Sequence, residues 1–387
     1  MALVDSRARV EALRAAGGEP AATALVELAE AEPLLGHRQA VVRKLLEEAA
    51  LVLDSLANRT LEGRVLLRLA HVKLSEADLE GVEQLAARAQ ERLAGDADRA
   101  LEIGALVTRS LVRRKRFEEA ANQLVVLGRQ EPADPSPLGA RRASAQLLLA
   151  LAELSLEQQE WEQAGKHLAV LDDAVSDDAE LVEVRFSCLQ GKAAVALALG
   201  DRERGIQALR KIVAIAKELD AAEDEIEARI ALAGALVERG DPVGLEEAQK
   251  LLQVSRDRAL EANLDSLYTA ALIGQAGVLA KRGKTKAALD RCIEIAQRAA
   301  ETQDLTRYAL AVALMSNIYE QLGDLASAYR SFAEAHASLR EKIGDAARDV
   351  IVPHIQAFAA RIGAEKFREV AENVTKAAHA RNAFRPE

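Results

Sequence analysis

Candidate turns recur along this sequence at nearly constant spacing, and no other feature limits the possible folds as strongly. Positions that mark the passage from one helix to the next return at intervals of 38 to 44 residues. These positions are Gly36, Ala77, Lys115, Gln159, Gly200, Gly240, Gly283 and Gly323. A fixed period of this length indicates a repeat architecture, in which each unit packs mainly against its sequence neighbours.

The segments between the turns have helical character. They are rich in Ala, Leu, Glu, Arg and Gln, which favour helices. Within 181–200, apolar residues recur at Leu181, Val184, Leu189 and Ala193, which is the spacing of one helix face. The sequence contains no convincing strand pattern. It therefore predicts an all-α fold in which each unit is a helical hairpin.

Small side chains recur in step with the turns. Seven residues before each turn stand Ala29, Ala70, Thr108, Ala152, Ala193, Ala233, Ala276 and Ser316. Five residues after the turns stand Val41, Val82, Ala120, Ala164, Gly205, Ala288 and Ala328, with Ala248 displaced by an insertion in the sixth unit. A short side chain at a fixed position lets two helices cross closely. We expect both sets to lie between packed helices.

The turns themselves carry a capping pattern. Asp201, Asp241 and Asp324 each follow a turn glycine. Glycine readily adopts the left-handed conformation that ends a helix, and aspartate is a preferred N-cap of the next helix. Thr285, two residues after Gly283, is another candidate cap.

The repeated unit resembles the tetratricopeptide repeat. The eighth copy carries Ser316, Tyr319, Gly323, Ala328 and Phe332 at positions where that family has small, aromatic, Gly, Ala and aromatic residues. The usual unit has about 34 residues, so these longer units resemble the repeats of kinesin light chains, spindle-orientation adaptors and MalT-type sensors. The resemblance implies an α-solenoid, a right-handed superhelix of helical hairpins, that binds proteins or peptides.

The repeats suggest a domain organisation. We predict about three degenerate repeats over 1–130, a Pro-rich loop or hinge over 131–140, about five repeats over 141–345, and capping helices with a frayed tail over 346–387. The Pro-rich segment is either a hinge between two groups of repeats or an ordinary loop insertion in a continuous array of repeats. Gly363 is expected to divide the terminal helix pair, and Pro353 to lie in the first turn of its helix or to kink it.

Composition excludes several classes of protein. The net charge is −10 and aromatics make up 3% of the chain, whereas nucleic-acid binders usually present a basic face with stacking aromatics. No apolar stretch is long enough to span a bilayer, so we expect no membrane insertion. Two cysteines form no disulfide framework. The sequence favours a cytoplasmic location, and its Ala- and Arg-rich composition favours a bacterial source.

No pattern in the sequence points to catalysis, and the protein is predicted to be no enzyme. Gly277, Gly283, Lys284 and Thr285 nearly form a phosphate-binding loop, but the glycine spacing is wrong and a helix precedes them. The histidines lack the spacing of metal ligands. We therefore predict no metal site and no cofactor, and we expect Cys188 and Cys292 to be buried, inert thiols.

The resemblance implies that the first helix of each repeat lines a concave groove, with inward positions ten, six and three residues before each turn. In the fifth to seventh repeats these positions are apolar or small, with Asn317 in the eighth. The predicted partner-binding residues are Ala194, Leu197, Ile230, Gly234, Val237, Ile273, Gly277, Ala280 and Asn317.

An open apolar groove of this length calls for an occupant. Our hypothesis is a non-catalytic scaffold or adaptor that receives a helix or peptide from another protein. A second copy of the chain, or its own C-terminal segment, is an alternative occupant. Tight winding that buries these rows is another alternative. A ligand- or peptide-responsive regulator that acts through a partner is the second hypothesis for function.

Overall fold

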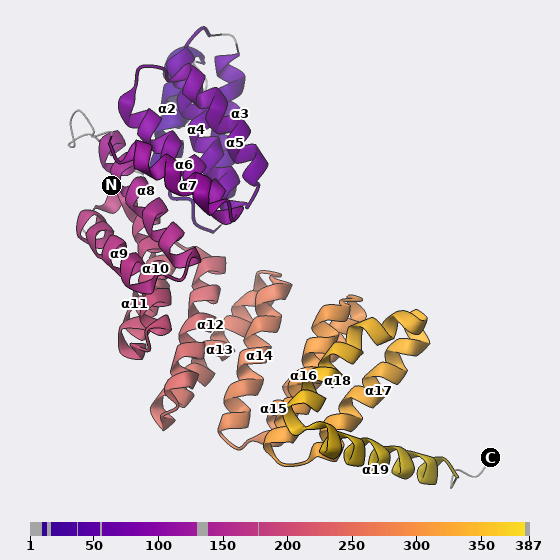
Figure 1. Cartoon of the computed structure of the whole chain (residues 1–387). Coiled ribbons are helices and arrows are strands. Elements are labelled where there is room, and N and C mark those ends of the chain that lie inside the picture. The colour runs from indigo at the N-terminus through magenta and orange to yellow at the C-terminus, as the bar shows by residue number, and fades with distance from the viewer. Residues whose placement is uncertain are drawn as a thin grey trace. The chain divides into compact units, whose positions relative to one another are not determined.

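The computed structural model describes residues 10–13, 17–36, 38–54, 56–129, 138–176 and 178–383. Within these ranges the chain is helical and contains no strand (Figure 1). The predicted Pro-rich loop falls largely on 130–137, which lie outside the described ranges. The helices on either side of it, α7 (Phe117–Leu127) and α8 (Leu138–Glu157), are in contact, and α8 packs more extensively against α6 (Ala97–Arg113).

The helices form consecutive hairpins, each made of a first helix and a second helix, which we call the A and B helices. The first four hairpins are α2 (Gly18–Ala31) with α3 (Arg38–Leu53), α4 (Arg59–Ser75) with α5 (Leu79–Arg92), α6 (Ala97–Arg113) with α7 (Phe117–Leu127), and α8 (Leu138–Glu157) with α9 (Trp161–Val175). The next four are α10 (Val182–Ala198) with α11 (Arg202–Glu218), α12 (Ala222–Arg239) with α13 (Pro242–Glu261), α14 (Asp265–Lys281) with α15 (Thr285–Glu301), and α16 (Leu305–Gln321) with α17 (Leu325–Ile343). A terminal pair follows, α18 (Ala347–Ile362) with α19 (Ala364–Ala383).

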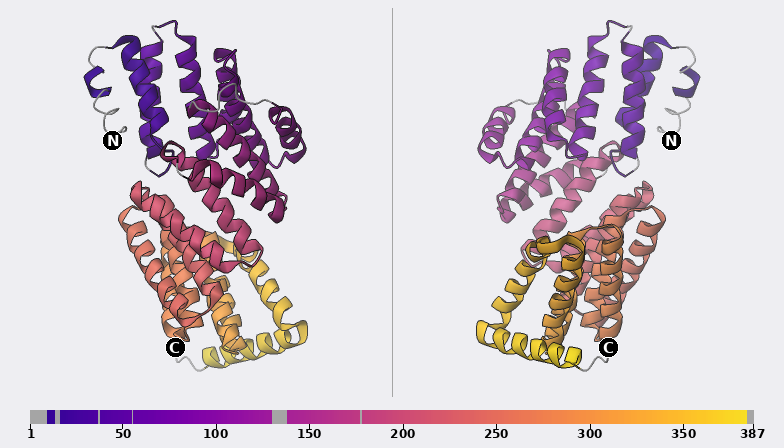
Figure 2. Two further views of the ribbon diagram at one scale, coloured as in Figure 1. Left: turned by 90° about the vertical axis from the view of Figure 1, so that its left-hand side faces the viewer. Right: turned by 90° about the vertical axis from the view of Figure 1, so that its right-hand side faces the viewer.

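The chain divides into two compact units, 1–228 and 229–387, with the boundary inside α12. We call them unit 1 and unit 2 and describe each by itself. In unit 1 the A helices α2, α4, α6, α8 and α10 form a series in which each member contacts the next. In unit 2, α14 touches α16 and α16 touches α18. The two views of Figure 2 show the paired helices within each unit.

The predicted turns have the backbone conformation that ends a helix. All eight turn residues have positive φ angles, from 52° at Gly36 to 80° at Gly200. Three of them, Ala77, Lys115 and Gln159, are not glycine, although the left-handed conformation costs such residues about 1–2 kcal/mol. The expected aspartate caps are also present, because Asp201, Asp241 and Asp324 each accept a backbone hydrogen bond from the residue three positions later.

The small residues before the turns lie in the helix interfaces as predicted. All eight are buried, and none is more than 3% exposed. They hold the hairpins together at close range, so the chain builds its core from Ala, Leu, Val and Ile with few aromatic residues.

Two local expectations were wrong, and of the two alternatives for Pro353 the first-turn position does not hold. Val41 is 40% exposed while Val42 is fully buried, because the link after α2 is longer than the other intra-hairpin turns and rotates α3. Thr285 is the first residue of α15 and Lys284 holds the cap position without a capping side chain. Pro353 lies in the interior of α18 rather than in its first turn.

The terminal pair closes the exposed end of the last repeat. Phe332 of α17 lies with its ring 6.0 Å from that of Phe358 in α18, and Phe358 lies 6.2 Å from Phe367 in α19. Phe332 and Phe358 are essentially fully buried. Aromatic rings at such distances add to the stabilisation from burial. Three of the few aromatic side chains are therefore concentrated at this end of unit 2.

Candidate functional site

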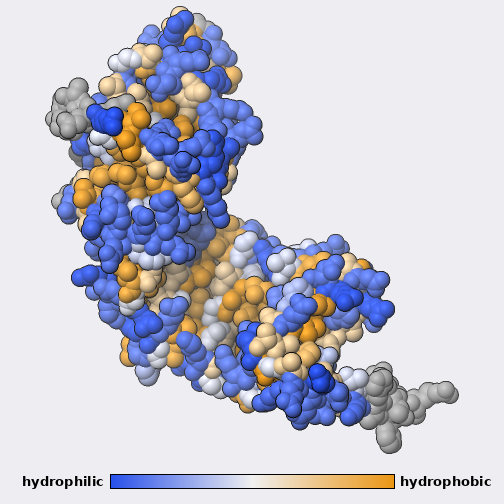
Figure 3. Space-filling view, in the orientation of Figure 1, coloured by the Kyte–Doolittle hydropathy of each residue, from blue (hydrophilic) through white to orange (hydrophobic). Residues whose placement is uncertain are grey.

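In unit 2 the predicted groove residues lie on the surface of the A helices. Gly234, Gly277 and Asn317 are exposed, and Ile230, Val237, Ile273 and Ala280 are partly exposed. We call these seven residues, on α12, α14 and α16, the unit-2 strip. Apolar residues gather over α14 and its neighbours in the space-filling view (Figure 3).

Polar contacts link the helices that carry the strip. Lys281 Nζ on α14 donates to the carbonyl oxygen of Val237 on α12 at 2.9 Å. Arg361 on α18 donates to Asn317 Oδ1 at 2.9 Å and forms an ion pair with Glu320 at 2.8 Å. Asn317 is thus engaged by the terminal helix pair, and Val237 is engaged only through its backbone carbonyl.

Two glycines in the strip are not required by packing. A Cβ atom added to Gly234 or to Gly277 would meet no atom within 4 Å. Gly274, one turn from Gly277, is different, since its Cβ would lie 2.6 Å from Leu252 of the preceding B helix. Gly191 in unit 1 is likewise filled by Leu168 at 2.8 Å. Gly274 and Gly191 therefore serve packing between helices, whereas Gly234 and Gly277 leave open space.

One further residue belongs to this surface, although the predicted rows do not include it. Leu310 on α16 is 39% exposed. It stands thirteen residues before Gly323, one helical turn beyond the rows that we considered. A fourth row in the same register would have included it.

The two predicted residues in unit 1 lie on α10. Ala194 is exposed and Leu197 is partly buried. Leu197 packs against the hairpin partner, because a Cβ on Gly205 would lie 2.7 Å from it. Leu197 therefore takes part in repeat packing as well as facing outward.

In the first four repeats most residues at the inward positions are buried. The residues ten positions before the turns, Val26, Leu67, Ala105 and Leu149, are at most 3% exposed. The residues six positions before the turns are Glu30, His71, Arg109 and Glu153, and all of them make side-chain polar contacts. Unit 1 thus fills its inner face with its own charged groups.

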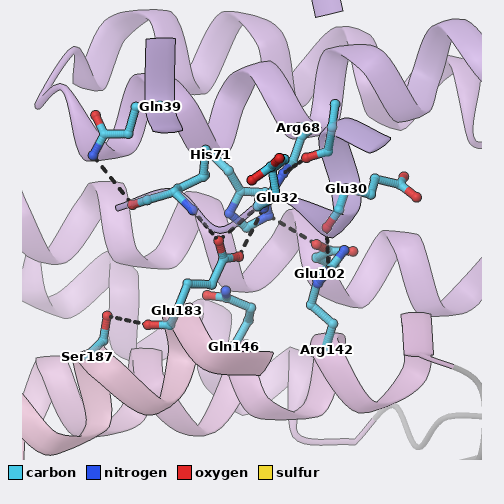
Figure 4. A network of polar contacts seen from close by, with 12 residues as sticks. Glu30, Glu32, Gln39, Arg68, His71, Glu102, Arg142, Gln146, Glu183 and Ser187 are labelled. Atoms are coloured by element: carbon cyan, nitrogen blue, oxygen red, sulfur yellow. Dashed lines mark hydrogen bonds and ion pairs between the residues drawn. The ribbon is translucent and has the colours of Figure 1, made fainter. Parts of the chain in front are cut away.

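An ion pair between distant repeats lies at the centre of this face (Figure 4). Arg68 of α4 is 3% exposed and donates to both carboxylate oxygens of Glu183 on α10, at 2.9 and 3.2 Å. The same carboxylate accepts from the backbone N–H of Leu34, in the link after α2, at 3.0 Å. Glu183 therefore joins the first, second and fifth repeats.

The titration behaviour of the buried groups follows from these contacts. Burial raises the pKa of Glu183, but the charge and hydrogen bonds of Arg68 outweigh burial and hold that pKa far below its usual value. Burial lowers the pKa of His71, and its hydrogen bond to Glu102 compensates only in part. At neutral pH we therefore expect uncharged His71 to donate from Nε2 to Glu102 Oε1, 3.0 Å away.

Other chemistry has little support in the described parts of the chain. Cys188 and Cys292 are fully buried, and burial raises the pKa of each thiol to about 12. No three His, Cys, Asp or Glu side chains among the described residues are grouped so that they could hold a metal ion. No helix in the same ranges combines the length and apolar character needed to cross a bilayer.

The chain resembles known proteins in structure rather than in sequence. No family model and no curated protein matches it. It is similar to the apo form of RapI, with 12% identity, a TM-score of 0.64, and coverage of 83% of this chain and 88% of that one. It is also similar to a STAND protein with a tetratricopeptide repeat sensor from Pyrococcus horikoshii (14% identity, TM-score 0.59), covering 81% of this chain and 47% of the other.

A third similar structure is NprR in complex with its cognate peptide NprX, at 16% identity and a TM-score of 0.50. This match covers 81% of this chain and 88% of that chain. At such identities the likeness establishes the fold alone. The fold of this chain is a tetratricopeptide-like α-solenoid of paired helices.

Proposed function

We propose that the protein is a non-catalytic scaffold or adaptor that binds a peptide or helix of another protein along the unit-2 strip. The observation that carries this proposal is the open space at Gly234 and Gly277. A glycine inside a helix costs about 1 kcal/mol relative to alanine, and no neighbour in the described part of the chain requires either one. A surface without side chains at these points lets the backbone of a bound segment approach closely.

The side chains around the glycines suit an apolar segment. Ile230, Val237 and Ile273 are partly exposed, and Leu310 adds a further apolar side chain on α16. Burial of apolar area contributes about 25 cal/mol per Å², so covering these side chains would stabilise a complex. The expected ligand presents apolar residues on one face, as amphipathic helices and some extended peptides do.

A ligand-responsive regulator is the second candidate. NprR, one of the similar structures, holds a cognate peptide, and another contains a tetratricopeptide repeat sensor. In this chain the boundary between the two units lies inside α12, and Ile230 and Gly234 of the strip follow it on the same helix. A peptide on the strip would therefore contact the helix that contains the boundary, and its binding would alter recognition of a partner protein.

A capture experiment with matched variants tests the proposal. Ile273→Asp places a charge in the strip, and Ile293→Asp places the same charge on α15, where Ile293 is 42% exposed. The tagged full chain and each variant would be used to capture partners, followed by titration of a synthetic segment of the captured protein. We expect Ile273→Asp to weaken that titration at least about tenfold, since an unpaired charge is costly to bury, and Ile293→Asp to leave it unchanged.

Two outcomes would contradict the proposal. If both variants bind the segment as tightly as the natural chain, the strip is not the binding surface. If the chain self-associates in light scattering and Ile273→Asp abolishes that association, a second copy occupies the strip instead of a different protein. Circular dichroism of each variant ensures that lost binding is not lost folding.

A further inference from the structure

A small polar cavity opens on the inner face of unit 1. Its volume is about 110 Å³, and its polar lining includes His71, Arg109, Arg113, Gln146 and Glu183. At about 30 Å³ for each water molecule, this space has room for about three or four waters, or for one carboxylate or phosphate group. The cavity lies within repeats that belong to a single compact unit.

The arginines around the cavity differ in their partners. Five arginines are each paired with a carboxylate. These pairs are Arg38–Glu32, Arg64–Glu30, Arg68–Glu183, Arg99–Glu102 and Arg109–Glu153. Arg113 and Arg142 have no ion-pair partner among the described residues, and each donates only to a backbone carbonyl, of Leu74 and Glu30 respectively. Of the charged side chains that line the cavity, Arg109 and Glu183 are each in an ion pair, and Arg113 is in none within the described part of the chain.

Two side chains that line the cavity, Arg113 and Gln146, have hydrogen-bond donors without an acceptor among the described residues. The side chain of Arg113 is exposed and lines the mouth of the cavity. Of its nitrogen atoms only Nη1 donates a hydrogen bond within the described part of the chain, to the carbonyl oxygen of Leu74. Gln146 is 2% exposed; its Oε1 accepts from Arg109 Nη1 at 2.8 Å, while its amide nitrogen has no hydrogen-bond partner among the described residues. Gln146 lines the cavity, so an acceptor bound there would receive a hydrogen bond from this amide.

The carboxylate beside the cavity does not compete for these donors. Glu183 already accepts from both terminal nitrogens of Arg68 and from the backbone N–H of Leu34. One turn before Gln146 on α8, Arg142 is 3% exposed, and its Nε has no hydrogen-bond partner among the described residues. Its charge adds to the positive potential in this region.

We propose that this cavity binds a small oxyanion, a carboxylate or phosphate group, which accepts hydrogen bonds from Arg113 at the mouth and from the Gln146 amide inside. Arginine is suited to such groups because its planar fork donates two parallel hydrogen bonds. Partial desolvation lowers the pKa of Arg113, an effect that Glu153 opposes and Arg109 reinforces, and a bound anion would relieve this cost. This site is separate from the unit-2 strip and does not depend on the function proposed for it.

Calorimetric titration of the full chain with inorganic phosphate and, separately, with acetate, at constant ionic strength, tests the proposal. Arg113→Gln removes the charge, and Gln146→Glu keeps the acceptor for Arg109 while it removes the amide donors. Arg88→Gln is the matched control, since Arg88 is an exposed arginine of α5 outside the cavity. We expect saturable binding of at least one anion, weakened about tenfold or more by Arg113→Gln and by Gln146→Glu, and unchanged in Arg88→Gln.

The two arms identify the ligand class. Saturation by acetate alone indicates a carboxylate, and saturation by phosphate alone indicates a phosphate group. The proposal is overturned if neither anion gives saturable binding, or if Arg113→Gln binds as tightly as the natural chain. If Gln146→Glu does not retain the natural circular-dichroism spectrum, Arg113→Gln decides the result.

Discussion

Arg68 and Glu183 are 115 residues apart in the chain, yet their guanidinium and carboxylate groups form a two-point ion pair at 2.9 and 3.2 Å inside unit 1. Arg68 also donates to the carbonyl oxygens of Ala29 and Glu32, at 3.1 and 2.6 Å. The pair therefore ties the inner faces of three repeats together. Contacts of this range are uncommon in repeat arrays, where each unit contacts mainly its neighbours.

Removing one member of this pair should be strongly destabilising. Arg68→Met leaves the Glu183 carboxylate buried without its partner, so we expect a loss of about 3–5 kcal/mol in the free energy of unfolding. The double variant Arg68→Met with Glu183→Leu should lose less, since no unpaired charge remains. Equilibrium urea unfolding measures both. As a control, Glu180→Gln affects an exposed ion pair with Arg141 and should cost less than about 1 kcal/mol; equal losses for Arg68→Met and Glu180→Gln would contradict this account.

The buried histidine predicts a pH dependence near neutrality. Because burial lowers the pKa of His71, the unfolded chain takes up a proton below about pH 6.5 that the folded chain does not. Folding stability should therefore fall as the pH decreases from 7 to 5. His71→Gln retains a donor to Glu102 without titrating, and its unfolding free energy, measured at pH 7 and 5, should decrease less. A decrease as large as that of the natural chain would show that His71 is not the group responsible.

A second acidic transition is expected from Glu183. Its folded pKa is far below the unfolded value, so its contribution to stability is complete above about pH 4.3 and is lost as the pH falls further. Thermal unfolding between pH 5 and 3 should show a steep decrease in midpoint temperature. The Arg68→Met, Glu183→Leu variant should show a shallower decrease, and parallel curves would count against this assignment.

Neighbouring glycines on α14 should respond oppositely to the same substitution. Gly277→Ala adds a methyl group to open space and should stabilise the helix by about 1 kcal/mol. Gly274→Ala places the methyl group 2.6 Å from Leu252, and overpacking of this kind costs about 1–3 kcal/mol. Urea unfolding of the two variants and of the natural chain shows whether each substitution raises or lowers the free energy of unfolding. Destabilisation by Gly277→Ala would mean that the strip is more tightly packed than the structure shows.

The two thiols should be unreactive in the folded protein. Cys188 and Cys292 are fully buried and burial raises the pKa of each to about 12, so almost no thiolate is present at pH 8. A chromogenic disulfide reagent should detect no thiol in the native chain and both thiols in guanidinium chloride. Rapid reaction of either cysteine under native conditions would indicate that its repeat opens locally.

The sequence predicts the repeat geometry well because local constraints produce it. Gly200 and Gly323 end helices in the left-handed conformation, and Ala70 and Ala276 lie where helices cross, so each is recognisable from its neighbours in sequence. Even Ala77, Lys115 and Gln159 were located by periodicity alone, although none is a glycine.

The inner face of unit 1 could not be predicted in the same way. Nothing in the local sequence pairs Glu183 with Arg68, because the two residues lie in different repeats. Pairings between distant repeats depend on how far the array turns, which no local pattern determines. The strip in unit 2 was placed by register alone, and its role as a binding surface stays a prediction.

The link after α2 has a consequence for how the protein unfolds. Arg38 Nε, at the start of α3, donates to the carbonyl oxygen of Leu219 at 2.8 Å, across 181 residues of sequence. The backbone N–H of Leu34 likewise donates to the distant carboxylate of Glu183. An open solenoid can lose its terminal repeat while the rest persists, so its ends fray first. Here the first hairpin is fastened to the fifth, so removing it also exposes the interior of the repeats between them. We therefore expect unit 1 to resist stepwise truncation and to melt as one cooperative body.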